Sequence, residues 1–165
     1  MAAVGSLVTN AIPFVPYGDT SHVLAGREVA SATYIRGTPL ILNGGRLDEL
    51  TINSNTNIVG IAAEPSTGTT DAEVLYWPAT SDTVFVGTFE DDQALGHAIA
   101  IGDLYIDYSC ETDDDGIWFI DQGETGASNV IVVLVGLRDW QDMTDATVRT
   151  RVLFRFLADV TIYNT

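Results

Sequence analysis

The sequence has no lysine, only one cysteine and only two histidines among its 165 residues. A Walker-type phosphate-binding loop requires a lysine, so this chain cannot form one. A single cysteine, Cys110, excludes an intrachain disulfide and any paired-cysteine metal or redox motif, and we interpret it as a small buried hydrophobic residue. His22 and His97 lack the spacing of a helical zinc-binding pair. Several common cofactor and metal motifs are therefore excluded.

Long hydrophobic runs are also missing. The longest apolar stretch, residues 130–137, is far too short to span a bilayer. The first residues have no basic segment ahead of an apolar one, so they are not expected to act as a secretory signal. With 46% hydrophobic residues, the chain nevertheless has enough apolar side chains for one globular domain with a real core.

Positive charge is scarce. Twenty-three acidic residues outnumber seven arginines, giving a net charge of −16. Such a surface repels nucleic acids and anionic membranes, so we expect neither as a partner. The acidity is explained either as a solubility device or as adaptation to high salt. The absence of lysine resembles the composition of proteins from salt-loving archaea and their viruses.

Helical periodicity is hard to find, and the pattern predicts an all-β fold. Short runs rich in Val, Ile, Thr, Tyr and Phe alternate with clusters of Gly, Asn, Asp, Pro and Ser. Asn43-Gly44-Gly45 predicts a tight hairpin turn. Residues 90–98 are the best candidate for a helical turn, and residues 129–137 predict a strand buried on both faces. The remaining predicted strands cover residues 27–35, 39–42, 46–52, 56–63, 72–79, 82–89, 104–108, 117–121, 148–157 and 160–163.

The first 24 residues differ from the rest of the chain. They contain a single charged residue, Asp19, and two prolines with apolar neighbours. This composition predicts an extended N-terminal arm, which could lie on a neighbouring subunit.

Residues 58–68, IVGIAAEPSTG, place an acid beside a hydroxyl. Glu64, Ser66 and Asp71 could be drawn as catalytic groups, but Pro65 and Gly68 are typical of an exposed turn after a strand. The small residues Gly60, Ala62 and Ala63 suggest that something packs closely on this strand. Since no nucleophile elbow is present either, the sequence predicts no catalytic residue and favours a protein that is not an enzyme.

The acidic segment ETDDDG, residues 111–116, partly matches a calcium-binding loop. Glu111, Asp113 and Asp115 occupy alternating ligand positions, and Gly116 follows them. However, Gln122 stands where the loop needs a bidentate glutamate, and strands flank the segment. Two interpretations remain: a weak metal site formed by Glu111, Asp113 and Asp115, or an acidic hairpin turn. No other cofactor is expected.

Residues 36–89 contain an ordered series of motifs. Gly37, Pro39, Leu40 and Leu42 form a G-x-P-L-x-L line, and a glycine-containing turn follows it. Next come IVGIAAE, residues 58–64, and two further predicted strands, 72–79 and 82–89. This order resembles the capsid decoration, or cement, proteins of tailed viruses.

The resemblance implies a β-tulip or β-sandwich-like body in residues 25–102. Residues 103–165 would complete or extend it as a small second β-subdomain. It also implies a homotrimer on the outer surface of an icosahedral capsid, bound to the major capsid protein at three-fold and quasi-three-fold positions. Two alternatives remain open. One is a carbohydrate- or calcium-binding β-sandwich, favoured by Trp77, Trp118 and Trp140 and by the acidic turn. The other is a turret, tail or fibre protein.

Overall fold

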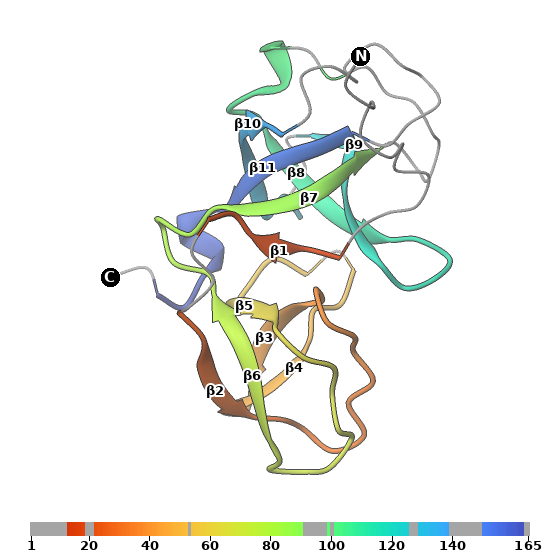
Figure 1. Ribbon diagram of the computed structural model, residues 1–165, viewed down its shortest axis with the longest axis vertical. Coiled ribbons are helices and arrows are strands. Elements are labelled where there is room, and N and C mark those ends of the chain that lie inside the picture. Colours follow the sequence, from red (N-terminus) through yellow and green to blue (C-terminus); the bar gives the residue numbers. More distant parts are fainter. Residues whose placement is uncertain are drawn as a thin grey trace, which may run out of the picture.

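The computed structural model describes residues 13–18, 22–52, 54–90, 99, 101–125, 129–138 and 150–163. Within them the strands build two sheets, and the helical elements are two short 3-10 turns, η1 (Ile101–Asp103) and η3 (Ala158–Val160). The prediction of an all-β fold is therefore confirmed. The two sheets form the two halves of an elongated body (Figure 1).

The first sheet closes on itself as a small barrel, which we name the N-terminal barrel. Its strand order is β2-β6-β5-β3-β4, and all neighbours in this order are antiparallel. A parallel bridge between Glu28 and Leu47 joins the two outer strands and closes the ring. The strands are β2 (Leu24–Arg27), β3 (Pro39–Asn43), β4 (Arg46–Glu49), β5 (Ile58–Ala62) and β6 (Glu73–Pro78).

The second sheet forms the C-terminal barrel, in which the strand order is β7-β11-β10-β8-β9. Parallel pairing between β7 and β9, with Phe89 opposite Ile120 and Glu90 opposite Asp121, closes this ring. The strands are β7 (Phe85–Glu90), β8 (Asp107–Thr112), β9 (Trp118–Thr125), β10 (Val132–Leu137) and β11 (Thr150–Phe156).

The two barrels have the same strand connectivity, although the sequence shows no clear repeat. In each, the first strand pairs with the fifth, the fifth with the fourth, the fourth with the second and the second with the third; a parallel contact between first and third closes the ring. A buried glutamate marks both closures: Glu28 just after β2, and Glu90 at the end of β7. Strand pairing depends on backbone hydrogen bonds and side-chain alternation, so unrelated sequences can share this topology.

The chain passes from one barrel to the other between Pro78 and Phe85. Thr80 and Thr83 form a turn there, with a backbone hydrogen bond of 3.2 Å and hydroxyl groups 2.7 Å apart. From the sequence, β7 was expected to belong with residues 25–102, whereas its strand partners are β11 and β9. The change of sheet therefore falls before β7.

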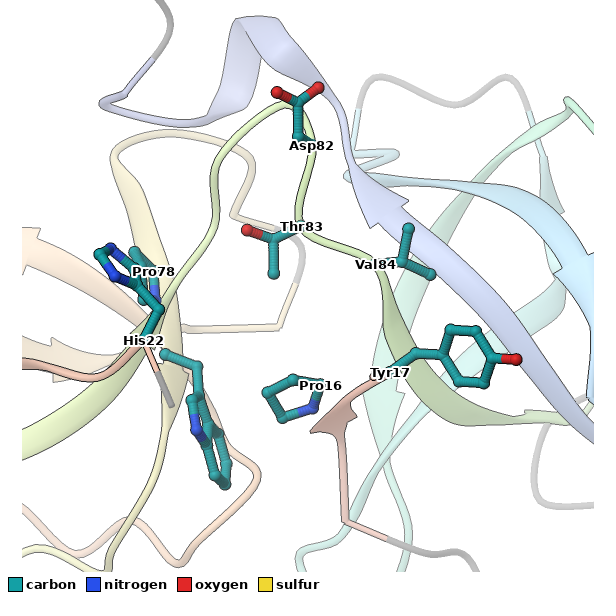
Figure 2. A pocket seen from close by; sticks show the side chains of 8 residues that line it. Pro16, Tyr17, His22, Pro78, Asp82, Thr83 and Val84 are labelled. Carbon is teal, nitrogen blue, oxygen red and sulfur yellow. The ribbon is translucent and has the colours of Figure 1, made fainter. Parts of the chain in front are cut away.

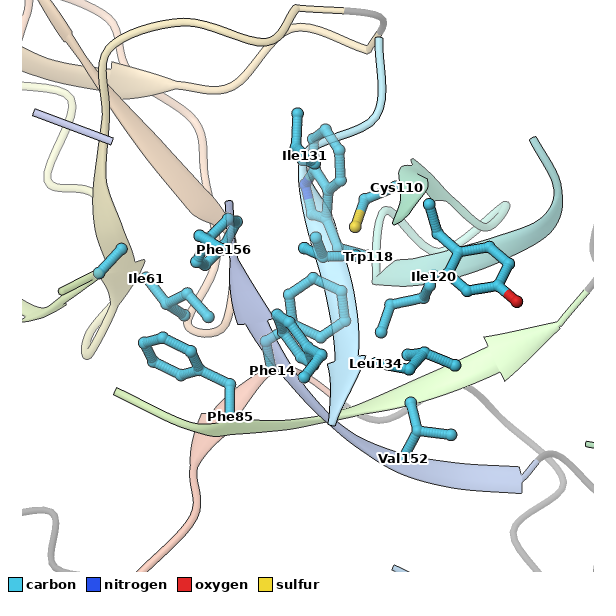
Figure 3. Packing of buried hydrophobic residues seen from close by; sticks show 14 of the residues in the cluster. Phe14, Ile61, Phe85, Cys110, Trp118, Ile120, Ile131, Leu134, Val152 and Phe156 are labelled. Atoms are coloured by element: carbon cyan, nitrogen blue, oxygen red, sulfur yellow. The ribbon is translucent and has the colours of Figure 1, made fainter. Parts of the chain in front are cut away.

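A continuous core joins the two barrels. β5 is buried at all five positions. Val59 and Ala62 pack inside the N-terminal barrel, whereas Ile58 and Ile61 belong to the cluster that fills the C-terminal barrel. Figure 3 shows Ile61 in the same cluster as Phe14, Phe85 and Phe156.

The described part of the N-terminal arm packs on its own chain. β1 (Val15–Pro16) is extended and pairs with the start of β7. Because β11 occupies one edge of β7, β1 and β9 share the other edge. Phe14 is fully buried in the C-terminal barrel, with its ring 4.8 Å from that of Phe154. Residues 1–12 and 19–21 of the predicted arm lie outside the described residues.

Some strand predictions hold, and others are wrong. The Asn43-Gly44-Gly45 turn is confirmed, because both glycines adopt positive φ between β3 and β4. The strand expected over 27–35 ends near Glu28, since Ser31 takes a left-handed conformation with φ of 60° that interrupts it.

Two more predictions fail in the last third of the chain. β10 alternates between buried and half-buried residues, so it is not buried on both faces. The strand expected at 160–163 is replaced by the end of η3 and a single bridge between Thr161 and Ile58. The helical turn predicted at 90–98 lies, beyond Glu90, outside the described residues.

Candidate functional site

The groups that first suggested catalysis have separate structural contacts. Glu64 Oε1 accepts a hydrogen bond from the backbone N–H of Leu75, at 2.8 Å. Ser66 Oγ donates to the carbonyl oxygen of Tyr34, at 3.1 Å. β5 ends at Ala62, so this stretch is the end of a strand followed by a loop, as the sequence predicted.

Asp71 forms a bidentate ion pair with Arg46. The two nitrogen–oxygen distances are 2.8 and 3.1 Å. These hydrogen bonds lower the pKa of the Asp71 carboxyl group. The pair is exposed, and it links β4 to the loop before β6. Asp71 therefore holds a loop and faces no catalytic partner in the described structure.

Glu28 anchors the same loop from inside. Its carboxylate is buried and accepts hydrogen bonds from the backbone N–H groups of Thr67, at 3.1 Å, and Thr69, at 3.0 Å. The hydroxyl groups of Thr67 and Tyr34 also donate to it. Burial raises the pKa of Glu28, but the hydrogen bonds from Thr67, Thr69 and Tyr34 outweigh it, so the pKa lies below its ordinary value.

Replacing Glu28 with glutamine is expected to lower the free energy of unfolding by about 2–3 kcal/mol at pH 7, because the amide NH₂ would face donors that now bind a carboxylate. The lowered pKa means that the ionised group stabilises the fold above its ordinary pKa of about 4.3. This contribution is lost as the pH falls through the lowered pKa of the folded protein. The difference in unfolding free energy between wild type and Glu28→Gln should therefore become smaller in acid. Urea unfolding of both proteins at several pH values measures this difference.

The control is Glu64→Gln, which alters a carboxylate that accepts one hydrogen bond, from Leu75. Its expected loss is below about 1.5 kcal/mol. Equal losses of unfolding free energy in the two variants would contradict the role of Glu28 as a buried, ionised anchor of the loop. A loss for Glu28→Gln that does not change with pH would also contradict it.

The acidic segment 111–116 forms the turn between β8 and β9. Asp113 Oδ1 accepts hydrogen bonds from the backbone N–H groups of Asp115, at 3.0 Å, and Ile117, at 2.8 Å. Gly116 adopts a positive φ of 75°. Asp113 is thus part of the turn itself, Glu111 lies on β8, and Asp115 is exposed. Across the described residues, no three His, Cys, Asp or Glu side chains converge as a metal site.

Cys110 is buried in the C-terminal barrel, which confirms its interpretation as a small hydrophobic residue. Burial, followed by the negative charges of Asp121 and Glu111, raises the pKa of its thiol well above the ordinary value. The reactive thiolate form is therefore disfavoured at neutral pH.

Two of the three tryptophans are buried side chains. Trp77 lies under the guanidinium of Arg36, which is 5.1 Å from its ring centroid. Trp118 is 2% exposed and belongs to the shared core. Trp140 lies outside the described residues. Neither described ring forms an open platform on which a sugar could stack.

A groove runs between the barrels beside the N-terminal arm. Figure 2 shows Pro16 between Pro78 of β6 and Val84 of the connecting loop, and Trp77 also lines the groove. Its volume is about 180 Å³, below the roughly 300–1,000 Å³ of typical small-molecule sites. The groove is therefore too small for a drug-sized ligand.

An exposed apolar tip precedes β8. Ile101 and Tyr105 are 69% and 74% exposed, and Ile106 is also exposed. Tyr105 adopts a φ of 63°, a left-handed conformation that bulky residues rarely take. Its N–H donates to the carbonyl of Leu134 at 2.8 Å, which fixes the turn. The fold thus holds a strained tyrosine that contributes little to the core, and such strain often marks a functional segment.

This tip is not among the candidate sites that the sequence indicates. The segment AIAIGDLYI, residues 98–106, is visibly apolar, but an apolar run of this kind is more often core. The backbone conformation of Tyr105 has no sequence signal, because a left-handed position is normally indicated by Gly, Asn or Asp.

Comparison of the chain with protein-family models, curated proteins and solved structures finds no match. In the portion that the structure describes, no helix is long and apolar enough to cross a membrane.

Proposed function

We propose that the protein is a virion structural protein that binds the outer surface of an icosahedral capsid. It acts as a homotrimer at three-fold and quasi-three-fold positions and stabilises contacts between major capsid subunits. The observation that carries the proposal is the tip formed by Ile101, Tyr105 and Ile106, three exposed apolar side chains on a chain with a net charge of −16. The order of strand motifs between residues 36 and 89 supports it as well.

The exposed apolar tip and the acidic surface both suit a protein that binds to the outside of a capsid. Exposed apolar side chains rimmed by polar surface are typical of protein contact sites. A trimer presents three copies of the tip, so weak individual contacts act together through multivalency. The acidic surface suits an outward-facing position, because the same charge would repel packaged DNA. This role requires no catalytic residue and no cofactor.

The direct test uses expanded capsids of the virus that encodes the protein, stripped of the protein itself. Purified protein is added back to these capsids. We expect co-sedimentation and extra density at three-fold and quasi-three-fold positions in a reconstruction. Light scattering should give three times the chain mass of 17.7 kDa. Failure to bind capsids would refute the proposal, and density on the tail, fibres or turrets would assign the protein to another virion component.

The tip can be tested with Tyr105→Asn in the same assay. Asparagine tolerates left-handed φ, so stability should stay equal or rise by up to about 1 kcal/mol. Capsid affinity should fall at least about tenfold, because an exposed aromatic anchor is lost. The matched control is Tyr17→Asn, at a half-exposed tyrosine outside the tip, and it should keep its affinity. Unchanged binding by Tyr105→Asn would remove the tip from the contact.

A further inference from the structure

Positive charge gathers at the groove between the barrels. The guanidinium of Arg36 lies 5.1 Å from the ring centroid of Trp77, which lines the groove. The guanidinium of Arg138 lies 5.7 Å from the ring centroid of Tyr17, which lines it from the arm. A third arginine, Arg155, donates to a backbone carbonyl of the loop that joins the barrels, at 3.2 Å. Three of the seven arginines of the chain thus contact the groove or the loop beside it.

The two stacked arginines are available for an anionic partner. Both are exposed, and no ion pair joins Arg36 or Arg138 to a carboxylate among the described residues. A guanidinium that stacks on a ring keeps its in-plane N–H donors for a carboxylate. Asp82 also lines the groove, but Figure 2 shows its carboxylate pointing away from Pro16. The groove therefore presents two positioned cations to an anionic group.

The acidic turn between β8 and β9, residues 111–116, has the complementary charge. Asp114 and Asp115 are exposed, and neither forms an ion pair with a described residue. Asp113 fixes the turn with two hydrogen bonds from side chain to backbone. A turn that is rigid before binding loses little conformational entropy when it docks. Figure 1 shows this turn on the opposite side of the body from the loop 79–84, so the turn cannot reach the groove of its own chain.

We propose that the groove binds the acidic turn of a second copy of this chain. The two arginines would pair with Asp114 and Asp115, and the groove, at about 180 Å³, accommodates one side chain of the turn. Copies with a net charge of −16 repel one another, so an interface between them needs opposite charges in register. The two surfaces differ, so the contact is head-to-tail and can close into a ring. The inference rests on the proposed function for the number of copies, three.

The test measures the association of the purified protein by light scattering at fixed ionic strength and several concentrations. Replacing Arg36 and Arg138 with glutamate should raise the dissociation constant of the trimer at least about tenfold, because acids would then face acids. Asp114→Arg with Asp115→Arg should have a similar effect. The variant with all four substitutions keeps the net charge of wild type and should regain trimers, which also shows that the reversed groove still folds.

The matched control adds the same charge elsewhere. Glu73→Arg with Asp159→Arg, at two exposed acids outside the turn, also restores the net charge when combined with the reversed groove. This control should not restore trimers, because the new arginines do not meet the groove. Tyr17→Asn keeps both guanidinium groups and should assemble like wild type.

Three results would overturn the inference. If the reversed groove left the trimer unchanged, the groove would not be the contact, although the homotrimer would stand. If the control restored trimers as well as the four-fold variant does, net charge alone would explain the effect. If wild type stayed monomeric at every concentration, the homotrimer would also be wrong, whereas binding to capsids is decided separately by the capsid assay. A reversed groove that formed trimers but lost capsid binding would assign the groove to the capsid instead.

Discussion

The Gly60→Ala variant is expected to lose at least about 3 kcal/mol of unfolding free energy. A Cβ atom at position 60 would lie 2.0 Å from the carbonyl oxygen of Trp77 and 2.9 Å from Cδ2 of Tyr76. The first of these is backbone, so it cannot rotate away. Relief would require β5 and β6 to separate, although Gly60 pairs with Pro78 across them.

The Gly60→Ala substitution should destabilise both barrels. β5 contributes one face to each core, through Val59 and Ala62 on one side and Ile58 and Ile61 on the other. A displaced β5 would therefore open both cores together. Tryptophan fluorescence and far-ultraviolet circular dichroism should report the same lowered urea midpoint.

Gly102→Ala is the matched control. A Cβ at position 102 meets no atom within 4 Å, and this glycine does not have positive φ. Its free energy of unfolding should stay within about 0.5 kcal/mol of wild type. If Gly60→Ala were as stable as this control, the result would contradict the close packing of β5 against the Trp77 carbonyl on β6.

Position 60 also shows how far sequence reasoning reaches. The small residues Gly60, Ala62 and Ala63 indicate that something packs closely on this strand, and the structure confirms it with the Trp77 carbonyl. Pro65 correctly indicated that the strand ends before it. Such local signals work because backbone geometry restricts the residue at its own position.

Long-range pairing is less accessible to sequence reasoning. Glu28 and Thr67 are far apart along the chain, and neither residue type alone predicts a buried carboxylate at a barrel closure. The parallel contact between β7 and β9 likewise joins strands that are not consecutive. A strand sequence specifies which face is apolar but not which neighbour it binds, so the closure of two similar rings was not predictable.

The candidate site shows the same limit. Arg36 and Arg138 lie beside one groove only because the end of β6 and the N-terminal arm line the same space. Conversely, Glu111, Asp113 and Asp115 are neighbours in sequence, but alternation along a strand and the turn hydrogen bonds of Asp113 give them different environments. Spacing in the chain therefore predicted the hairpin turn better than it predicted a site.

Replacing Phe14 with alanine should cost about 3–5 kcal/mol, because a fully buried aromatic ring would leave a cavity. The ring packs 4.8 Å from Phe154 and covers Gly87, where an added Cβ would meet Phe14 Cε1 at 2.6 Å. Since these contacts lie within one chain, the difference in urea midpoint between wild type and variant should not depend on protein concentration. An arm that docked only on a neighbouring subunit would instead give a midpoint difference that changes with protein concentration.

Two comparisons make the Phe14 prediction specific. Tyr17→Ala, on the same arm but half exposed, should cost less than about 1.5 kcal/mol, including its contact with Arg138. Gly87→Ala should cost less in the Phe14→Ala background than in wild type, because two of the three nearest clashing atoms belong to Phe14. Additive effects in this double-mutant cycle would contradict the packing of Phe14 over Gly87, and with it the insertion of the N-terminal arm into its own barrel.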